Sequence, residues 1–288
     1  MEETVRLGFC GFDPGAFLSE LRPPAPNDLI DAELRLGTRP LGSAPGRAAG
    51  RTEGVPRPHL GWLSMLADLV MGTAYAAALG EGRTSLTLSM RIDSVRGALR
   101  PDVPIEGYAL AEDPDDPGGV LHCLMLQGRQ PVATGVGRFL PLGTRARSAP
   151  AEVVSFQRRG VDLATGFGLS GDWAPDIDVD LRAEGVLANP SGVVHGGVQA
   201  AIAAEAIIRS VAGVDASMCL LTDLSTRFLA PAPTGPEERL VVRVRRIHTG
   251  RSLRTVRVEL VRGDGVVVSV SEGTVGRNPV MDSLVNSH

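Results

Sequence analysis

Residues 189–198 have the sequence NPSGVVHGGV and continue directly into the apolar segment 199–211. The adjacent glycines, Gly196 and Gly197, allow a sharp backbone bend and a close approach by a ligand. The first amide groups of a helix have no partner within the helix and carry the positive end of its dipole. This stretch therefore predicts a turn that opens a helix, where the free amides suit an oxygen that gains negative charge during a reaction.

Two polar residues, Asn189 and His195, lie beside these amides in the sequence. The spacing Asn-x5-His-Gly-Gly before an apolar helix resembles the hotdog-fold acyl-CoA thioesterases, specifically the phenylacetyl-CoA and 4-hydroxybenzoyl-CoA thioesterase type. His-Gly-Gly alone is not specific, and the upstream Asn and the downstream helix supply the specificity. The alternative is a glycine turn whose histidine is held in the core.

The composition limits the class of protein. A length of 288 residues suggests about two domains. The net charge of −4 argues against a nucleic-acid-binding protein. All 29 basic residues are arginine, which excludes Schiff-base and phosphate-loop lysines. The three cysteines, Cys10, Cys123 and Cys219, are far apart and odd in number, which indicates no disulfide framework or zinc site and favours a cytoplasmic location.

Segment 62–79 is long and mostly apolar, but Asp68 interrupts it. A membrane span needs about 20 apolar residues with few charges. A helix that is apolar all round is also typical of the interior of a soluble protein. We therefore predict a buried helix and no membrane span, and the acidic N-terminus lacks the apolar core of a signal peptide.

The chain contains two copies of one pattern. The sequence IDAELR at 30–35 has its counterpart IDVDLR at 177–182, an offset of 177 − 30 = 147. His59 and His195 each precede an apolar helix, and their offset is 195 − 59 = 136. The difference of 11 residues predicts a longer first loop at 38–58, rich in Gly, Pro and Arg.

Apolar runs separated by turn signals follow each helix and predict four strands per copy. They lie at 85–92, 104–111, 120–127 and 131–139, and at 222–229, 239–248, 252–261 and 266–275. One strand, one helix and four strands is an α+β pattern with antiparallel sheets. The resemblance implies a tandem double hotdog, in which two antiparallel β-sheets each wrap a central α-helix.

The predicted domains are an N-terminal hotdog at 1–142 and a C-terminal hotdog at 151–278. Residues 142–150 form the linker, and 279–288 form a polar tail. The family arrangement also implies that double hotdogs can pair as a homodimer.

In the family, an acidic residue nine positions after the motif histidine acts as general base or nucleophile. The first copy has Asp68 at this position, because 59 + 9 = 68, but it lacks the glycine pair. The second copy has the glycines, but 195 + 9 = 204 is Ala204, and Glu205 comes one residue later. The first copy therefore keeps the acidic residue of the family site, and the second copy keeps the glycine pair.

Nine residues of helix rise about 13 Å, so Asp68 cannot reach the start of its own helix. It can reach the start of the other helix if the two run side by side in opposite directions, as the resemblance implies. We therefore predict one composite site of Asp68 and Gly196. A second site formed by Glu205 and the His59 turn would be degenerate.

The resemblance implies hydrolysis of an acyl-CoA thioester. The Gly196 amide would bind the carbonyl oxygen, Asp68 would activate water or attack the carbonyl itself, Asn189 would hold the water or the carbonyl, and His195 would orient the turn. Gly197 and a hydroxyl at Thr84 or Ser85 complete the predicted substrate-binding set. The structural alternative for Asp68 is a buried carboxylate bonded to backbone, and for the hydroxyls it is an ordinary strand position.

The substrate class requires no cofactor, since CoA is part of the substrate, and no His, Cys or acidic cluster has metal-ligand spacing. The phosphates of CoA need positive charge, for which the candidate arginines are Arg47, Arg51, Arg57, Arg243, Arg245, Arg251, Arg254 and Arg257. For any single arginine, a position on the solvent-exposed face of a sheet is a simpler interpretation than phosphate binding.

Two other functions compete with hydrolysis. Ala204 and the missing glycine pair in the first copy favour a catalytically degenerate acyl-CoA-binding hotdog protein. Asn189-Pro190 superficially resembles hotdog hydratases and dehydratases, but there the histidine follows Asn-Pro almost at once, with an aspartate nearby. The acyl chain preferred by the protein stays open.

Overall fold

The computed structural model describes the two helices and the strands around them. The described residues are 35–40, 47–53, 59–80, 84–95, 99–100, 103–111, 118–128, 130–142, 178–182, 192–212, 219–235 and 237–277. The alternating sequence at 30–35 predicts a strand, of which residues 30–34 lie outside the described residues. The 143–150 part of the linker, the tail and Asn189 also lie outside them.

The elements of the N-terminal half are β1 (Arg35–Pro40), β2 (Arg47–Glu53), α2 (Leu60–Leu79), β3 (Thr84–Ser94), β4 (Ile105–Ala111), β5 (Val120–Gln127) and β6 (Gln130–Leu142). Those of the C-terminal half are β7 (Asp178–Arg182), α4 (Gly196–Ala212), β8 (Cys219–Phe228), β9 (Arg239–Thr249), β10 (Leu253–Arg262) and β11 (Val267–Arg277). The eight strands predicted after the two helices are all present, with ends that differ by up to three residues.

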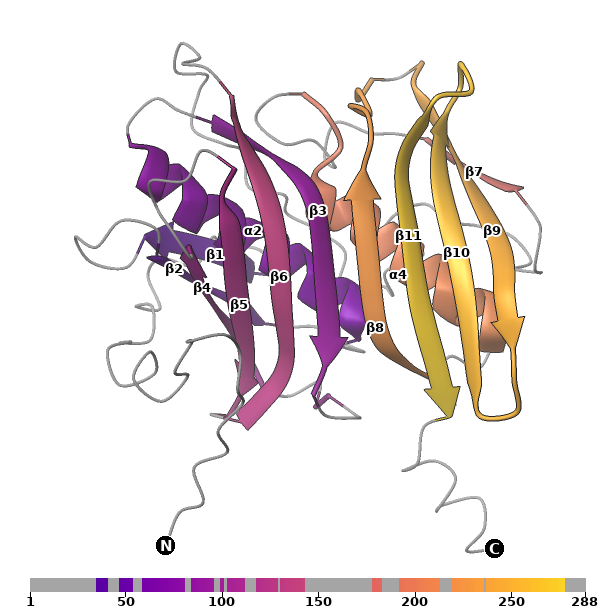
Figure 1. The fold of residues 1–288 in the computed structure, drawn as a ribbon, viewed down its shortest axis with the longest axis horizontal. Coiled ribbons are helices and arrows are strands. Elements are labelled where there is room, and N and C mark those ends of the chain that lie inside the picture. The colour runs from indigo at the N-terminus through magenta and orange to yellow at the C-terminus, as the bar shows by residue number, and fades with distance from the viewer. Residues whose placement is uncertain are drawn as a thin grey trace, which may run out of the picture.

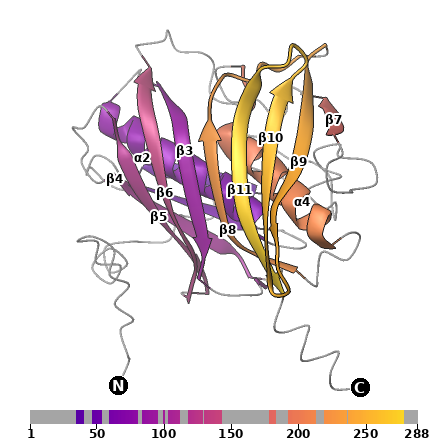
Figure 2. The same ribbon diagram turned by 45° about the vertical axis from the view of Figure 1, so that its right-hand side comes forward.

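The strands form one eleven-stranded sheet in the order β1-β2-β4-β5-β6-β3-β8-β11-β10-β9-β7. Each pair of neighbouring strands in this sheet is antiparallel. The α+β class with antiparallel pairing and two central helices is thus confirmed. The two predicted sheets join edge to edge through β3 and β8, whose pairing runs from Ser89↔Arg227 to Asp93↔Asp223 (Figure 1). Both helices lie against the same face of this sheet (Figures 1 and 2).

The region predicted as a long first loop, 38–58, contains a strand. Within it, β2 pairs with both β1 and β4. It lies beside β4 as β7 lies beside β9, so β2 is the positional counterpart of β7, and β1 is an additional edge strand. The loop prediction was wrong because Gly-rich and Arg-rich sequence has low strand propensity, and pairing between two existing strands overrode it.

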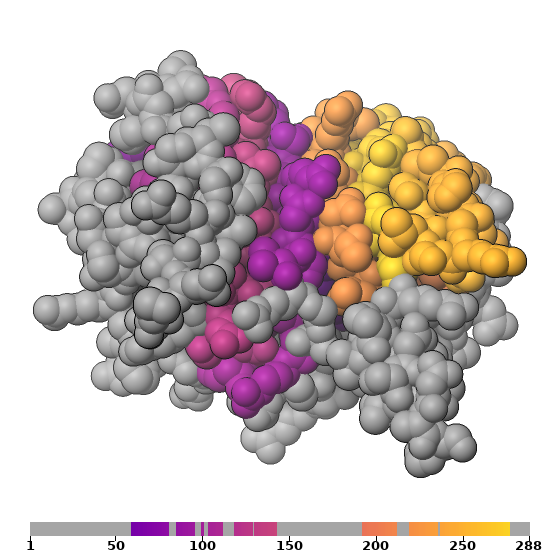
Figure 3. Space-filling view, turned by 60° about the horizontal axis from the view of Figure 1, so that its bottom comes forward, coloured from indigo at the N-terminus to yellow at the C-terminus, as the bar shows by residue number. Residues whose placement is uncertain are grey.

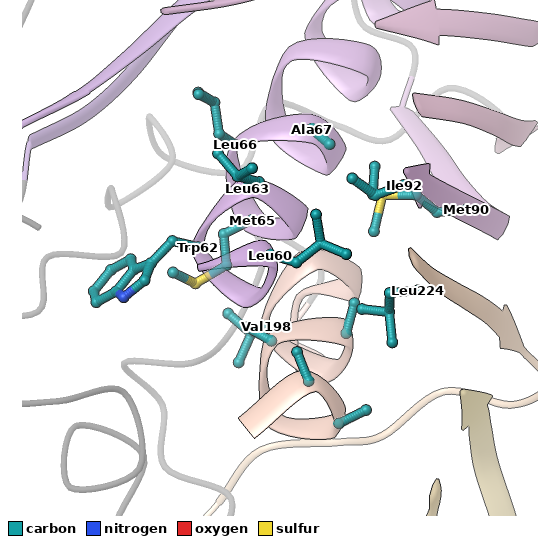
Figure 4. Packing of buried hydrophobic residues seen from close by; sticks show 14 of the residues in the cluster. Leu60, Trp62, Leu63, Met65, Leu66, Ala67, Met90, Ile92, Val198 and Leu224 are labelled. Carbon is teal, nitrogen blue, oxygen red and sulfur yellow. The ribbon is translucent and has the colours of Figure 1, made fainter. Parts of the chain in front are cut away.

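The two helices pack against each other at their N-terminal ends. Figure 4 shows Leu60 and Met65 of α2 close to Val198 of α4, with Met90 and Ile92 of β3 beside them. All five side chains are buried and belong to one hydrophobic cluster that continues through both halves. The halves also lie side by side at the surface (Figure 3). The shared core makes the two copies one folding unit in the described part of the chain.

Helix α2 passes the length and composition test for a membrane span, but it is the central helix of the N-terminal half. Its residues Leu66, Ala67 and Val70 are fully buried within the protein. The apolar surface of α2 is therefore covered by the rest of the chain, which supports the buried-helix prediction.

The closest approach between the helices occurs at glycines. A Cβ added to Gly197 would lie 2.8 Å from the Cα of Met65 and 3.0 Å from the Cβ of Asp68. At the related position on the other helix, a Cβ added to Gly61 would lie 3.1 Å from the Cβ of Ala204. The contact at Met65 is with backbone, which cannot turn aside, so the crossing requires glycine at position 197.

We expect Gly197→Ala to lower the free energy of unfolding by about 1–3 kcal/mol, because it forces α4 away from α2. Gly72→Ala is the matched control in α2, since its new Cβ would lie 3.8 Å from Phe139, an ordinary contact. That variant should stabilise the protein by about 0.5–1 kcal/mol, as expected for glycine inside a helix. Denaturant titration measures both, and equal effects would contradict the steric argument.

Candidate active site

Asp68 of α2 meets the start of α4, as the composite-site prediction requires. Its Oδ2 accepts a hydrogen bond from the Gly197 amide at 2.6 Å and lies 2.9 Å from Nδ1 of His195. Its Oδ1 accepts a bond from the Thr87 hydroxyl at 2.7 Å. The side chain of Asp68 is only 2% exposed. Three groups from outside its own helix thus hold one buried carboxylate.

The Gly196 amide is the neighbouring donor at the helix start. A Cβ on Gly196 would lie 2.9 Å from Oδ2 of Asp68 and 3.3 Å from the ring of Phe228. The first hydrogen bond that turns back into α4 runs from the Gln199 amide to the His195 carbonyl. Within the described part of the chain, no group accepts a hydrogen bond from the Gly196 amide, which leaves this donor available beside the carboxylate.

The environment keeps Asp68 ionised. Burial by itself raises the pKa of this carboxyl group. The charge and hydrogen bond of His195, with the hydrogen bonds from Thr87 and Gly197, outweigh burial and hold the pKa below the ordinary value of 3.8. The side chain is therefore an anion at neutral pH, which a general base or a nucleophile needs to be.

The nitrogen Nδ1 of His195 lies near two groups, 3.2 Å from the Gly197 amide and 2.9 Å from Oδ2 of Asp68. One nitrogen cannot accept from the first and donate to the second at the same time. The carboxylate is the stronger acceptor, and the Gly197 amide lies closer to it than to the imidazole. We therefore assign Nδ1–H as a donor to Asp68, which fits the predicted orienting role of His195.

The hydroxyl that contacts Asp68 belongs to Thr87 of β3, a residue that the sequence analysis did not single out. Thr84 and Ser85, the hydroxyl candidates proposed from the sequence, lie two or three residues earlier on the same strand, and their role stays a prediction. Ser85 and Thr87 are two residues apart and face the same side of the strand. The alternation of the strand therefore does not distinguish them, and only the position of α2 along β3 selects Thr87. The side chain of Thr84 and the whole of Asn189 lie outside the described residues.

A second cluster occupies the related position on the other side of the helix pair. The counterparts of Asp68, His195 and Gly197 are Ala204, His59 and Gly61, each separated from its counterpart by 136 positions. Here His59 Nδ1 accepts a bond from the Gly61 amide of its own helix at 3.1 Å. The acid is absent from the crossing, because Ala204 occupies its place.

Glu205 lies one residue further along α4 and is paired differently from Asp68. Its carboxylate is 3.2 Å from Nε2 of His59 and 2.6 Å from Nε of Arg209. Burial raises its pKa, but the bonds and charges of His59 and Arg209 outweigh burial and lower it below 4.5. Glu205 thus pairs with an arginine of its own helix, and unlike Asp68 it does not accept a hydrogen bond from the first amides of the other helix among the described contacts.

Several of the candidate phosphate-binding arginines have structural partners. Arg245 donates to the Val244 carbonyl at 3.0 Å, and Arg243 also has an interaction partner. Arg254 donates to the Val211 carbonyl at 3.0 Å, near the C-terminal end of α4. Arg257 lies 3.0 Å from Glu259 and 3.5 Å from Glu272. Of the others, the side chains of Arg47, Arg51 and Arg57 lie outside the described residues. Among the described residues, no group of three or more His, Cys, Asp or Glu could hold a metal ion.

The lowered pKa of Asp68 predicts a pH dependence of stability. Its contribution is complete above the unfolded-state value near 3.8 and disappears as the pH falls through the lower folded-state value. We expect the difference in unfolding free energy between the wild type and Asp68→Asn to shrink as the pH falls below about 4. Denaturant titrations from pH 7 to pH 3 measure this, and a difference that grows under acid would contradict it.

The chain has counterparts among known proteins. The family model described as the acyl-CoA thioesterase N-terminal domain matches residues 187–275, which include the His195 turn and α4. No curated protein sequence matches the chain significantly.

Three similar solved structures share the architecture. A putative oleoyl thioesterase of Lactobacillus plantarum has a TM-score of 0.57 and 10% identity, covering 80% of this chain and 96% of that one. A tesB protein of Mycobacterium avium subspecies paratuberculosis has a TM-score of 0.56 and 13% identity, with coverages of 84% and 96%. The acyl-CoA thioesterase II TesB2 of Mycobacterium marinum has a TM-score of 0.54 and 10% identity, with coverages of 84% and 94%.

At these identities the structural likeness establishes the fold, while the family model adds the sequence signature of the C-terminal half. The chain therefore has a hotdog fold, and its residues 187–275 are similar to the acyl-CoA thioesterase N-terminal domain.

Proposed function

We propose that the protein is a tandem double hotdog that hydrolyses an acyl-CoA thioester at one composite site between α2 and α4. The observation that carries the proposal is the buried Asp68 carboxylate beside the free Gly196 amide. An ionised base and an anion-binding donor, side by side, are what hydrolysis of a thioester needs.

The reaction assigns one role to each group. The thioester carbonyl oxygen binds to the Gly196 amide at the positive end of α4. Water attacks the carbonyl carbon and gives its proton to Asp68, and the oxyanion forms at the amide. Collapse of this intermediate breaks the carbon–sulfur bond and releases the CoA thiolate, which takes the proton from Asp68.

The hydrogen bonds of Asp68 favour a base over a nucleophile. Its Oδ2 accepts from Gly197 and His195, whereas Oδ1 accepts from Thr87 alone among the described residues. One acceptor direction on Oδ1 is therefore free for the proton of a water molecule. Attack by the carboxylate on the substrate would instead weaken several of these charge-assisted bonds.

The proposal also includes a role for Asn189, pairing of two chains and a cellular location. Asn189 is proposed to hold the water or the carbonyl, on the family resemblance alone, and the same holds for pairing of two chains. A cytoplasmic location fits Cys123 and Cys219, which are free thiols. A non-catalytic acyl-CoA binder is the second candidate, favoured by Ala204 and by the closed ion-pair cluster at Glu205.

We expect Asp68→Asn to lower kcat for acyl-CoA hydrolysis by about 10²–10⁴-fold, the usual value of a general base, without loss of folding. Glu205→Gln is the matched control, because it changes the same group at the related position and should retain most activity. Release of free thiol from a panel of acetyl, medium-chain, long-chain and aromatic acyl-CoAs provides the rate. Binding without turnover of any substrate would favour the non-catalytic function.

Two variants separate the effect of the Thr87 hydrogen bond from the effect of its side-chain volume. Thr87→Val keeps the volume but removes the hydroxyl that bonds Asp68, and we expect kcat to fall about 10-fold, as for loss of a hydrogen bond to a charged group. Thr87→Ser keeps the hydroxyl and should retain most of the rate. If both variants lost equal activity, packing rather than the hydrogen bond would explain the effect.

A further inference from the structure

Two buried polar atoms near the start of α4 have no hydrogen-bond partner. They are Oε1 of Gln199 and Oγ of Ser269, the two such side-chain atoms among the described residues. Gln199 is 5% exposed and Ser269 is 1% exposed. Folded proteins pair the large majority of their buried polar groups, so two unpaired atoms at one end of a helix indicate a polar group that is supplied from outside.

Contacts between α4 and the sheet place both atoms at the same end of the helix. A Cβ on Gly196 would lie 3.3 Å from the ring of Phe228 on β8, and one on Gly273 of β11 would lie 3.1 Å from Ile207 further along α4. Ser269 is the partner of Phe228 in the pairing of β11 with β8. The start of α4 therefore lies over Phe228, with Ser269 on the next strand.

Gln199 belongs to the same end of α4. It follows His195 by one helical turn, and its Nε2 donates to the Val194 carbonyl at 3.0 Å. This bond fixes the orientation of the amide, because only the NH₂ group can donate. The free atom is therefore the oxygen, which can only accept a hydrogen bond.

The neighbouring sheet surface is also polar. Thr226 and Ser271 are buried partners on β8 and β11 and hydrogen-bond each other at 2.9 Å. We call Gln199, Thr226, Ser269 and Ser271 the inner polar cluster. It contains no charged side chain, and burial of a charged group without a partner is costly. A neutral hydrogen-bonding group suits this cluster better than a carboxylate or an amine.

We propose that the inner polar cluster binds a hydroxyl group on the acyl part of the thioester, so that the preferred substrate is a hydroxyacyl-CoA with its hydroxyl close to the thioester. A hydroxyl is the smallest group that satisfies both atoms, since it donates to Oε1 of Gln199 and accepts from Oγ of Ser269. This inference rests on the proposed thioester hydrolysis and names its substrate class.

Phe228 connects the cluster with the reaction site. Its half-buried ring lies 3.3 Å from where a Cβ on Gly196 would be. The residue is also the cross-strand neighbour of Ser269. An acyl group whose carbonyl oxygen binds the Gly196 amide passes this ring within its first few carbons.

The test compares matched substrates. Hydrolysis of butanoyl-CoA, 3-hydroxybutanoyl-CoA and 4-hydroxybutanoyl-CoA is measured for the wild type, Gln199→Leu and Ser269→Ala. The control is Ser210→Ala, a buried serine further along α4 whose hydroxyl bonds the Ile207 carbonyl at 2.8 Å. We expect kcat/KM to favour one hydroxyacyl-CoA over butanoyl-CoA by about 10-fold in the wild type and in the control. The preference should fall toward one in the other two variants.

A binding measurement separates this inference from the proposed function. In an Asp68→Asn background, calorimetry gives the dissociation constants of the same CoA esters with and without Ser269→Ala. If butanoyl-CoA is hydrolysed as fast as both hydroxyacyl-CoAs, the inference is overturned and the proposed thioesterase activity is not. If neither these three esters nor any acyl-CoA of the panel above is hydrolysed, the proposed function is overturned, while the ratio of dissociation constants still decides the inference. A ratio near one, or one unchanged by the variants, means that the cluster holds only structural water.

Discussion

The close crossing of α2 and α4 is the contact on which the rest of the structure depends. The backbone of Met65 lies against the position that a Cβ would occupy on Gly197, and the Cβ of Ala204 lies against the same position on Gly61. At this separation the carboxylate of Asp68 reaches the amide of Gly197 directly. A larger residue at either crossing point would separate the Asp68 carboxylate from the start of α4, so the packing of the helices and the proposed chemistry depend on the same contact.

The same crossing explains why a buried aspartate is tolerated. An isolated carboxylate in the core is unstable unless it is paired or hydrogen-bonded. Here His195, Gly197 and Thr87 all face Asp68, and together they keep it ionised. These partners come from α4, from the turn before it and from β3, so the charged state of Asp68 is a property of both halves of the chain.

The two related positions of the helix pair have diverged in a physically consistent way. At one, an acid lies in the crossing beside a glycine pair. At the other, alanine fills the crossing, and Glu205 is turned about 100° around the helix, where it pairs with Arg209 and lies beside His59. The first arrangement holds a carboxylate against the start of the other helix, whereas in the second the carboxylate pairs with an arginine of its own helix.

Much of this could be predicted from the sequence. Local patterns predicted the two helices and the eight strands after them. The pairing of Asp68 with the start of α4 followed from helical rise together with the antiparallel helix pair that the family resemblance implies. The strand β2, the contact of Thr87 with Asp68, and the unpaired oxygen atoms of Gln199 and Ser269 were decided only by tertiary structure. Strand pairing and partner geometry depend on contacts between residues far apart in the chain, and no local pattern of side chains specifies them.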